Sequence, residues 1–269
     1  MSTPDQPAIF TIRSARPDDA AGILGVYAQG FPKPLLPLTA LGCHGGMTYI
    51  AQLIREARRG GSSPFWVAGD RHDAVVGFVQ WRLISDTAVI NNIYVRHVSR
   101  GQRIGRRLLA DSLQQLTWPF TLVELDVFAD NPRAKRWYET LGFCEDGRRV
   151  WLEGPRPKRA GGDYLLEGLP QADAVQQVLG FSLFRVTTKQ RVYRVGRLGE
   201  QWFRLFDPVA LDDSALMSAI ASIDAERKLF LLLDPHDAGT HSQLRPLATS
   251  IRMQAGRDRL LSLLKANTP

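Results

Sequence analysis

The sequence predicts a mixed α/β protein with a central mixed sheet flanked by helices, followed by a smaller α/β domain. Three observations support this class. Runs rich in valine, isoleucine and aromatic residues alternate along the chain with segments of helical periodicity. One helical segment, 104–116, separates the strand candidates 87–95 and 121–128, as a crossover helix does. The 269 residues, of which 44% are hydrophobic, suffice for one large domain or two modest ones.

The first part of the chain opens with a predicted strand at 9–13. A helix follows that Pro17 starts and whose apolar residues recur at helical spacing. The proline-rich run 31–37 predicts a loop. A second helix is expected from about Met47 to Arg59, where two glycines end it. Three strands separated by short polar turns come next, at 65–70, 74–84 and 87–95.

A short helix with clear ends follows the strand at 121–128. Asn131 is the predicted N-cap, and Pro132 occupies the first helical position. Gly142 is suited to end the helix in a left-handed conformation. A hairpin between two further strands, at 148–153 and 163–169, is predicted to close this part of the chain.

A domain boundary is predicted near Leu169, because the pattern of strands and helices restarts beyond it. Residues 1–168 form the first predicted domain and residues 169–269 the second. Helices of the second domain are predicted at 171–180, 211–224 and 256–264, and strands at 184–189, 191–198, 200–206, 228–234 and 249–254. This order permits a degenerate copy of the first domain, and it leaves open a role in dimerisation or in completing a substrate cleft. No Gly/Arg-rich phosphate turn is present there, so no cofactor is expected in it.

The composition limits which binding partners and which cellular compartment we expect. The formal charge of +7 and the pI of about 9.7 favour anionic partners: nucleic acid, acidic lipid or phosphorylated ligands. No apolar run is long enough to span a bilayer, and the N-terminus has no apolar core of a signal peptide. The two cysteines cannot form a disulfide framework. We therefore expect a cytoplasmic protein without a membrane partner.

The segment 91–109 carries the sharpest chemical pattern. A strand runs into a turn rich in arginine and glycine, and the turn opens directly into a helix. The first amides of a helix have no intrahelical partner and carry partial positive charge, so this arrangement favours an anion. Gly101 and Gly105 let a pyrophosphate approach the backbone closely. Arginines at four positions add positive charge around it, at 100, 103, 106 and 107.

This segment resembles the acetyl-CoA-binding motif of the GNAT superfamily, whose consensus is Arg/Gln-x-x-Gly-x-Gly/Ala. Here the motif reads from Arg100 to Gly105, with Arg103 where the family has its first glycine. The backbone of Arg103 can still donate if that residue adopts a right-handed or bridge conformation. A second stretch, 125–143, is similar to another signature of the family at Asn131, Ala134, Tyr138, Gly142 and Phe143. The resemblance covers about residues 9–168.

The resemblance implies an N-acetyltransferase in which a primary amine attacks the thioester of acetyl-CoA directly. The amine would belong to a small molecule, a protein N-terminus or a lysine. Tyr138 would be the general acid that protonates the departing thiolate, and Asn131 would orient the pantetheine or the helix start. The pantetheine arm would pair with the backbone of Ile93, Tyr94 and Val95. The pyrophosphate would lie on Arg100, Gly101, Gln102, Arg103, Ile104, Gly105 and Arg106.

Several alternatives remain open at this stage. The strand 87–95 has no carboxylate, so the general base is Glu124, Asp126, His97 or a water relay. By spacing alone, Tyr138 is typical of a core aromatic residue. A non-catalytic module that senses acyl-CoA or binds a partner is the second hypothesis, and a nucleic-acid-binding protein is a third that we disfavour. The polar loop 234–241 lacks a compact ligand spacing, so we predict no metal site.

Overall fold

The computed structural model describes residues 10–266, and its centre is one mixed sheet of twelve strands in the order β1-β2-β3-β4-β5-β12-β6-β11-β10-β9-β8-β7. One end holds β1 (Thr11–Ser14), β2 (Phe65–Gly69), β3 (Val75–Ile84), β4 (Thr87–Val95) and β5 (Leu122–Phe128). The other end holds β7 (Tyr164–Glu167), β8 (Phe181–Thr188), β9 (Val192–Leu198), β10 (Trp202–Leu205) and β11 (Lys228–Leu233). Two long strands lie between them, β6 (Cys144–Gly154) and β12 (Arg245–Gly256). The predicted mixed α/β class is confirmed.

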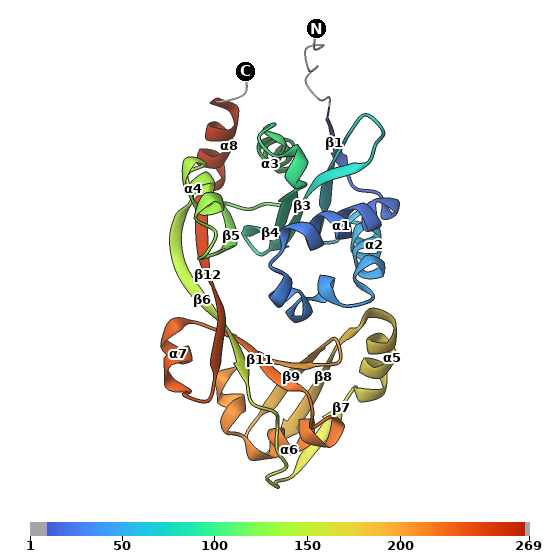
Figure 1. Cartoon of the computed structure of the whole chain (residues 1–269), viewed down its shortest axis with the longest axis vertical. Helices are drawn as coiled ribbons and strands as arrows, with labels where there is room; N and C mark the ends of the chain where they lie inside the picture. The colour runs from blue at the N-terminus through green and yellow to red at the C-terminus, as the bar shows by residue number, and fades with distance from the viewer. Residues whose placement is uncertain (1–9, 267–269) are drawn as a thin grey trace.

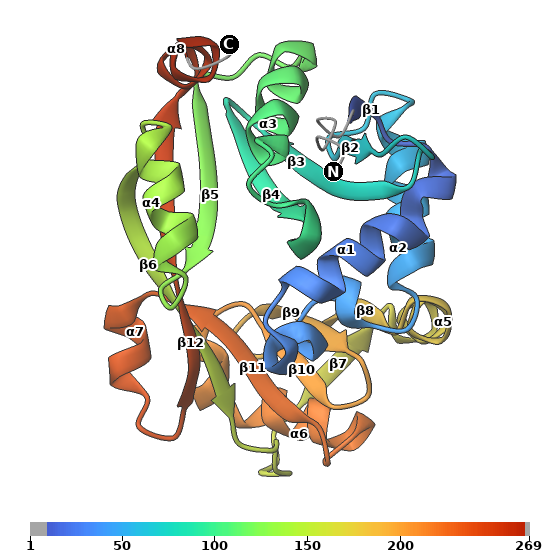
Figure 2. The same cartoon turned by 45° about the horizontal axis from the view of Figure 1, so that its top comes forward.

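The helices are α1 (Ala20–Gly30), α2 (Gly46–Ala57), α3 (Ile104–Gln115), α4 (Pro132–Thr140), α5 (Leu169–Leu179), α6 (Ser214–Ile223), α7 (Pro235–Thr240) and α8 (Arg257–Ala266). Figure 1 shows them around two lobes of the sheet, with α1–α4 and α8 on the upper lobe and α5–α7 on the lower one. The helix α8 lies beside α3, although the two are far apart in sequence (Figures 1 and 2).

Three local predictions are corrected. The proline-rich run forms a 3-10 helix, Lys33–Leu38, rather than a loop. The polar segment before Thr240 forms the short helix α7, which Asp234 caps through a bond from the amide of Asp237. The first strand begins at Thr11, and Ile9 of the prediction lies outside the described residues.

Strands β4 and β5 pair over only part of their length. They run parallel from Thr87 and Leu122 to Ile90 and Leu125, and no pair continues the ladder beyond these in the described chain. A β-bulge at Asn91, which has no partner on β3, coincides with the point of separation. The two strands then diverge, as Figure 2 shows. An opening in the middle of the sheet follows from this divergence.

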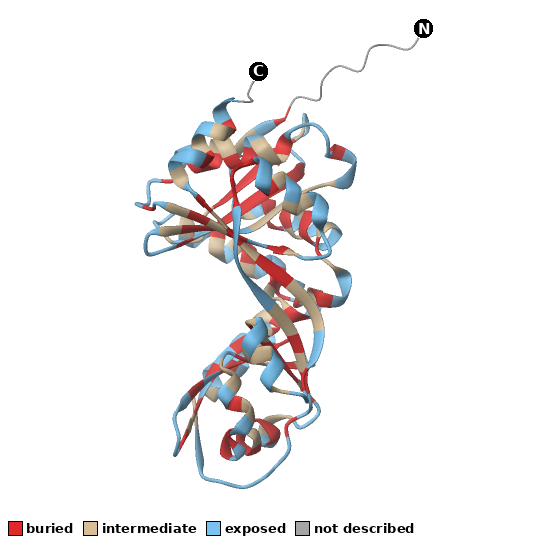
Figure 3. Cartoon of the chain, turned by 90° about the vertical axis from the view of Figure 1, so that its left-hand side faces the viewer, coloured by how far each residue is buried: buried red, intermediate tan, exposed pale blue. Residues whose placement is uncertain are grey.

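Strands β6 and β12 join the two lobes. The C-terminal part of β12, from Ser250 to Gly256, pairs antiparallel with β5, while β12 also pairs with β6 along most of its length. The far end of β6, from Val150 to Gly154, pairs with β11. Figure 3 shows this pair as a twisted ribbon that runs from one lobe into the other. The predicted hairpin between 148–153 and 163–169 is therefore wrong, because the longer-range partners of β6 replace β7, which pairs with β8.

The lobes also meet away from these strands. The amide of Gly45, before α2, donates to the carbonyl of Leu179 at the end of α5, at 3.2 Å. A Cβ at Gly45 would lie 2.4 Å from the Cα of Leu179, so a side chain there would push the two elements apart. The buried Sγ of Cys43 accepts from the amide of Gly199 at 3.3 Å. These contacts close the side of the molecule opposite the long strands.

The lower lobe repeats the element order of the upper one. In both, an antiparallel meander leads through a crossover helix to a parallel strand, then to a helix and a long strand. The strands β10 and β11 are parallel and flank α6, as β4 and β5 flank α3. The N-terminus of α6 is covered by Asp213, whose Oδ1 accepts from the amides of Ala215 and Leu216 at 3.0 and 3.1 Å. A carboxylate of the chain itself thus occupies the anion-binding end of this helix.

Replacing Asp213 with alanine is expected to lower the free energy of unfolding by about 2 kcal/mol, the upper end of the range for an N-cap. Burial alone would raise the pKa of this carboxyl. Hydrogen bonds from Thr188 and the α6 amides outweigh burial and hold the pKa below its ordinary value. The stabilisation is therefore complete above the ordinary aspartate pKa of about 3.9 and disappears as the pH falls through the lower pKa of the folded state. Urea denaturation at pH 7 and at decreasing pH measures both effects.

Asp207 is the matched control for this variant. Its side chain also caps a helical turn, through the amide of Val209 at 3.0 Å, but it is 42% exposed. We expect Asp207→Ala to cost less than half as much as Asp213→Ala. Equal losses in the two variants would mean that burial of the Asp213 carboxylate contributes nothing beyond an ordinary cap.

Candidate active site

A cleft of about 1140 Å³ opens where β4 and β5 diverge. Its upper walls come from α1, α2, β3, β4, the start of α3, β5 and α4, and its lower walls from β6, β10, β11 and β12. Both lobes therefore line it. Of the residues predicted to bind the cofactor or to act in catalysis, eleven line this cleft: Ile93, Tyr94, Val95, Arg100, Gly101, Arg103, Ile104, Gly105, Arg106, Asn131 and Tyr138. Gln102, the remaining one, is exposed and is not among the lining residues.

The turn before α3 uses two left-handed residues. Gly101 has a φ of +83° and Arg103 a φ of 59° with a ψ of 12°. They direct the chain so that α3 begins at Ile104 on the wall of the cleft. The first intrahelical bond is donated by Arg107 to the carbonyl of Arg103, so the amides of residues 104–106 precede the helical ladder. Arg103 thus does not adopt the right-handed or bridge conformation under which its backbone was expected to donate, because the turn has a positive φ at the position where the motif has glycine.

The Arg103→Gly variant is expected to gain about 0.5–1 kcal/mol in free energy of unfolding. A non-glycine residue in the left-handed region costs about 1–2 kcal/mol, and the greater freedom of glycine in the unfolded chain offsets part of that gain. Arg107→Gly is the matched control, since it removes the same charge from an exposed position inside α3 and should lose about 1 kcal/mol. Thermal and urea unfolding of both variants test the strain. A loss of stability in Arg103→Gly would contradict it.

The arginine side chains of this turn do not all face the same way. Arg100 donates from Nε to the carbonyl of Val95 at 3.2 Å. Arg106 turns toward the C-terminal helix, where its guanidinium donates to the carbonyls of Leu263 and Leu264. Arg106 can thus offer its amide to an anion, while its charge is directed at the last turn of α8. Arg103 is exposed at the mouth of the cleft.

Strand β4 forms one wall beyond the bulge. The Tyr94 ring packs edge-on against Tyr27, with centroids 5.5 Å apart, and lies 6.0 Å from the ring of Phe78. A Cβ at Gly30 would come within 2.2 Å of the Tyr94 ring, so this glycine permits α1 to pack there. The ring contacts fix Tyr94 while the β5 side of the strand stays open between Asn91 and Val95.

Tyr138 lies on α4 across the opening. Asn131 caps this helix as predicted, by accepting from the amide of Ala134 at 3.1 Å, and Gly142 ends it with a φ of +84°. The Tyr138 ring is buried, 4.9 Å from the ring of Trp137 and 5.8 Å from that of Phe143. Burial raises the pKa of its phenol, so the hydroxyl keeps its proton well above neutral pH. The protonated form is the one that a general acid requires.

The candidate general bases differ in whether they line the cleft and in what binds them. His97 is exposed and does not line the cleft. Asp126 lines it, but Arg252 of β12 binds both its oxygens, at 2.8 and 2.7 Å. The same guanidinium binds Glu124 at 3.1 Å. One guanidinium therefore engages both of these carboxylates.

A polar cluster at the bulge was missed by the sequence analysis. The Oε1 atom of buried Gln80 accepts from the side-chain amides of Asn91 at 3.0 Å and Asn92 at 2.7 Å. All three residues line the cleft. The signal was available, because a glutamine and two adjacent asparagines interrupt otherwise apolar strands. Such a cluster can hold a water molecule next to the point where the strands separate.

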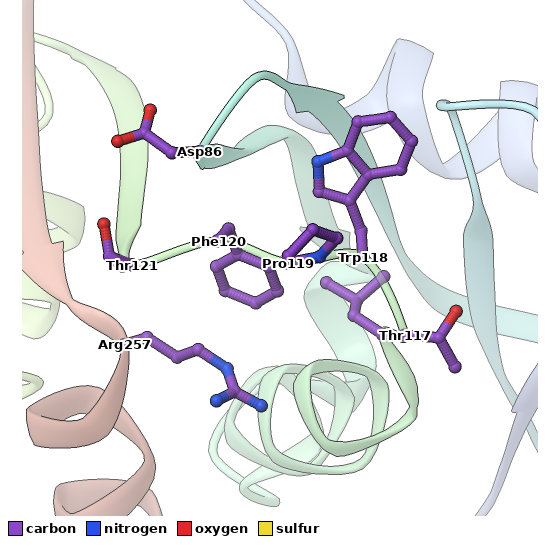
Figure 4. Close-up of a pocket in the computed structure, with 8 residues that line it drawn as sticks. Asp86, Thr117, Trp118, Pro119, Phe120, Thr121 and Arg257 are labelled. Carbon is purple, nitrogen blue, oxygen red and sulfur yellow. The ribbon is translucent and has the colours of Figure 1, made fainter.

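A second, smaller pocket of about 460 Å³ lies at the paired ends of β4 and β5, near Asp86 and Thr121 (Figure 4). Arg257 donates its amide to the carbonyl of Thr121, and its guanidinium lies 5.2 Å from the centre of the Phe120 ring. These contacts hold the start of α8 against the end of the sheet where β4 and β5 are still paired.

Two properties of residues 10–266 concern membranes and metals. None of the helices there combines the length and the apolar character needed to cross a bilayer. Within the same residues, no three or more His, Cys, Asp or Glu side chains are grouped so that they could hold a metal ion.

Comparison with known proteins gives a domain match over part of the chain and a fold. Residues 61–145 match the GNAT acetyltransferase domain. No curated protein matches the chain by sequence. A tandem GNAT protein from the clavulanic acid biosynthesis pathway superposes with a TM-score of 0.67 at 13% identity, over 93% of this chain and 99% of that one. A protein from Pyrococcus horikoshii classed as an acetyltransferase gives 0.62 at 14% identity, over 95% and 91%. A GCN5-related N-acetyltransferase from Sphaerobacter thermophilus gives 0.57 at 11% identity, over 92% and 96%.

Proposed function

We propose, since residues 61–145 match the GNAT acetyltransferase domain, that the chain transfers an acetyl group from acetyl-CoA to a primary amine in the cleft between β4 and β5. The start of α3 is the observation that carries this proposal. Its first amides lie on the cleft wall, next to the gap that the diverging strands leave. Both features suit a ligand with a diphosphate at one end and a narrow amide-bearing arm.

The residues present fit acetyl-CoA. The amides of Ile104, Gly105 and Arg106, with the glycine at 101, would hold the pyrophosphate. The open edge of β4 from Ile93 to Val95 would pair with the pantetheine arm. The arm would have to displace the Arg100 side chain from the carbonyl of Val95. Asn131 would act through the helix that it caps, since its side-chain oxygen is already bound to the Ala134 amide.

In the proposed reaction, the neutral amine attacks the thioester carbonyl carbon, and the C–S bond breaks. Tyr138 donates its proton to the leaving sulfur and recovers one from solvent. The proton of the amine leaves through a water molecule held at Gln80 and Asn92, because Arg252 engages Asp126, which lines the cleft, and Glu124 beside it on β5. The amide product and free CoA then leave the cleft.

We also propose that residues 169–269 form a second copy of the fold that has lost its cofactor site. The repeated element order supports the first part of this proposal. Asp213 supports the second part, because its buried carboxylate lies where the first copy leaves amides open to an anion. The retained role of this copy is then to supply the lower wall of the cleft through β10 and β11.

Isothermal titration with acetyl-CoA, followed by an assay of free thiol with a panel of primary amines, tests the proposed function. Binding in the micromolar range and thiol release with at least one amine are expected. Binding without release for any amine would favour an acyl-CoA sensor instead. Absence of both heat and thermal protection would overturn the cofactor site and the function together.

A further inference from the structure

Two arginines from different lobes line the cleft without an acidic partner. Arg82 lies on β3 and Arg204 on β10. Within residues 10–266, neither forms an ion pair, and neither side chain has a hydrogen-bond acceptor. Arg252, in the same cleft, shows the opposite arrangement, since it binds two carboxylates. Arginines without an acidic partner also line the cleft at the turn before α3 and on α4, at 100, 103, 106 and 133. Away from these, Arg82 and Arg204 are two cationic groups whose charge nothing in the described residues neutralises.

The position of Arg204 is fixed although its charge is not compensated. Its guanidinium lies 4.8 Å from the centre of the Phe206 ring and 5.8 Å from that of Phe230. Burial lowers the pKa of Arg204, and the nearby positive charges of Arg82 and Arg194 lower it further. A half-buried guanidinium among like charges is unfavourable unless an anion joins it. Guanidinium groups bind carboxylates and phosphates through paired N–H donors.

These charges lie beside the proposed acyl-transfer point. Arg82 and Gln80 share one face of β3, two positions apart, which separates their backbones by about 7 Å. Gln80 belongs to the polar cluster at the bulge of β4. A ligand whose amine reaches that cluster would present its other end to the two arginines. Tyr49 and Ser63 line the same cleft and add hydroxyl groups.

We infer that the acceptor is a small amine that also carries a carboxylate or phosphate, which Arg82 and Arg204 bind together across the two lobes. This inference rests on the proposed function and narrows it to a substrate class. It gives the C-terminal lobe a part in substrate selection, since Arg204 and the Phe230 ring both come from that lobe.

Matched pairs of amines test the inference in the full-length protein. Each pair joins an anionic amine with its neutral counterpart: phenylalanine with phenethylamine, 4-aminobutyrate with butylamine, and O-phosphoethanolamine with ethanolamine. We expect kcat/KM to be at least 10-fold higher for the anionic member of one or more pairs. The preferred pair then tells a carboxylate from a phosphate. Equal or better turnover of the neutral members would overturn the inference and leave the acetyltransferase function intact.

Two variants and one control complete the test. Arg82→Gln changes an exposed residue, whereas Arg204→Gln changes a half-buried one. If the Arg204→Gln protein fails to fold, the Arg82→Gln protein still tests the inference. Each should lower the preference for the anionic amine by 10-fold or more while leaving acetyl-CoA binding unchanged. Arg194→Gln removes a charge near Arg204 that does not line the cleft, and it should leave the preference within 2-fold. If no amine is turned over, calorimetric titration of the same anionic amines tests the inference instead. Binding to the unmodified protein that is lost in Arg82→Gln supports it. Absence of binding to the unmodified protein overturns it.

Discussion

Replacing Tyr138 with phenylalanine is expected to lower kcat by about 100-fold or more, the usual contribution of a positioned general acid. The change removes only the hydroxyl, so the ring contacts with Trp137 and Phe143 stay in place. Acetyl-CoA affinity should therefore be unchanged. Because burial raises the pKa of this phenol, its deprotonation should not limit the rate between pH 6 and 9 in the unmodified protein. Thiol release against pH and calorimetry on the same preparations measure these effects.

Tyr27→Phe is the matched control, because Tyr27 is a second buried phenol on the wall of this cleft. Its hydroxyl donates to Oγ1 of Thr39 at 3.2 Å, so the variant should lose about 1 kcal/mol of stability and little activity. A Tyr138→Phe protein with the kcat of the unmodified protein would show that solvent protonates the leaving thiolate.

Deleting residues 245–269, which include β12 and α8, is expected to abolish the cooperative unfolding transition of the whole protein. Ile251 and Met253 of β12 and Leu260 and Leu264 of α8 are all buried in the core of the upper lobe. At about 1.5–3 kcal/mol for each large apolar side chain, their loss removes about 6–12 kcal/mol. That is close to the whole stability of an ordinary protein of this kind, about 5–15 kcal/mol. Circular dichroism and thermal unfolding of the shortened chain test the expectation.

Two companion chains sharpen this experiment. A chain that ends at residue 256 keeps β12 and loses α8, so it should retain more structure than one that ends at 244. Residues 1–168 alone also lack β12 and should neither unfold cooperatively nor bind acetyl-CoA. If that fragment did both, the upper lobe would be an independent domain. The pairing of β12 with β5 and β6 would then be dispensable for its folding.

The contiguous signals in the sequence predicted the local structure of α4, beside the candidate site, well. Asn131, Pro132 and Gly142 define α4 through local capping rules, and the structure has all three as expected. The left-handed Arg103 was not foreseen, because propensity alone favours a right-handed conformation for arginine. The direction of the Arg106 side chain was not foreseen either, since its partners in α8 lie at the other end of the chain.

The long-range features were beyond the reach of sequence patterns. The sequence predicted β6 and β12 as strands, but adjacency in the chain suggested the wrong partner for β6. Arg252 neutralises Glu124 and Asp126 only because β12 lies beside β5. The pair Arg82 and Arg204 likewise depends on two lobes that face one cleft. Periodicity specifies which face of a strand is apolar, but not which strand lies next to it.

The late position of β12 has a consequence for biosynthesis. On a ribosome, β5 and β6 emerge long before the strand that must lie between them. At ordinary rates of translation this interval lasts on the order of ten seconds, during which both strands present unpaired edges. The nascent chain is thus open to pairing with other molecules until β12 appears. We expect its yield in cells to respond to chaperones that shield such edges, more strongly than that of a protein whose strands pair in the order of synthesis.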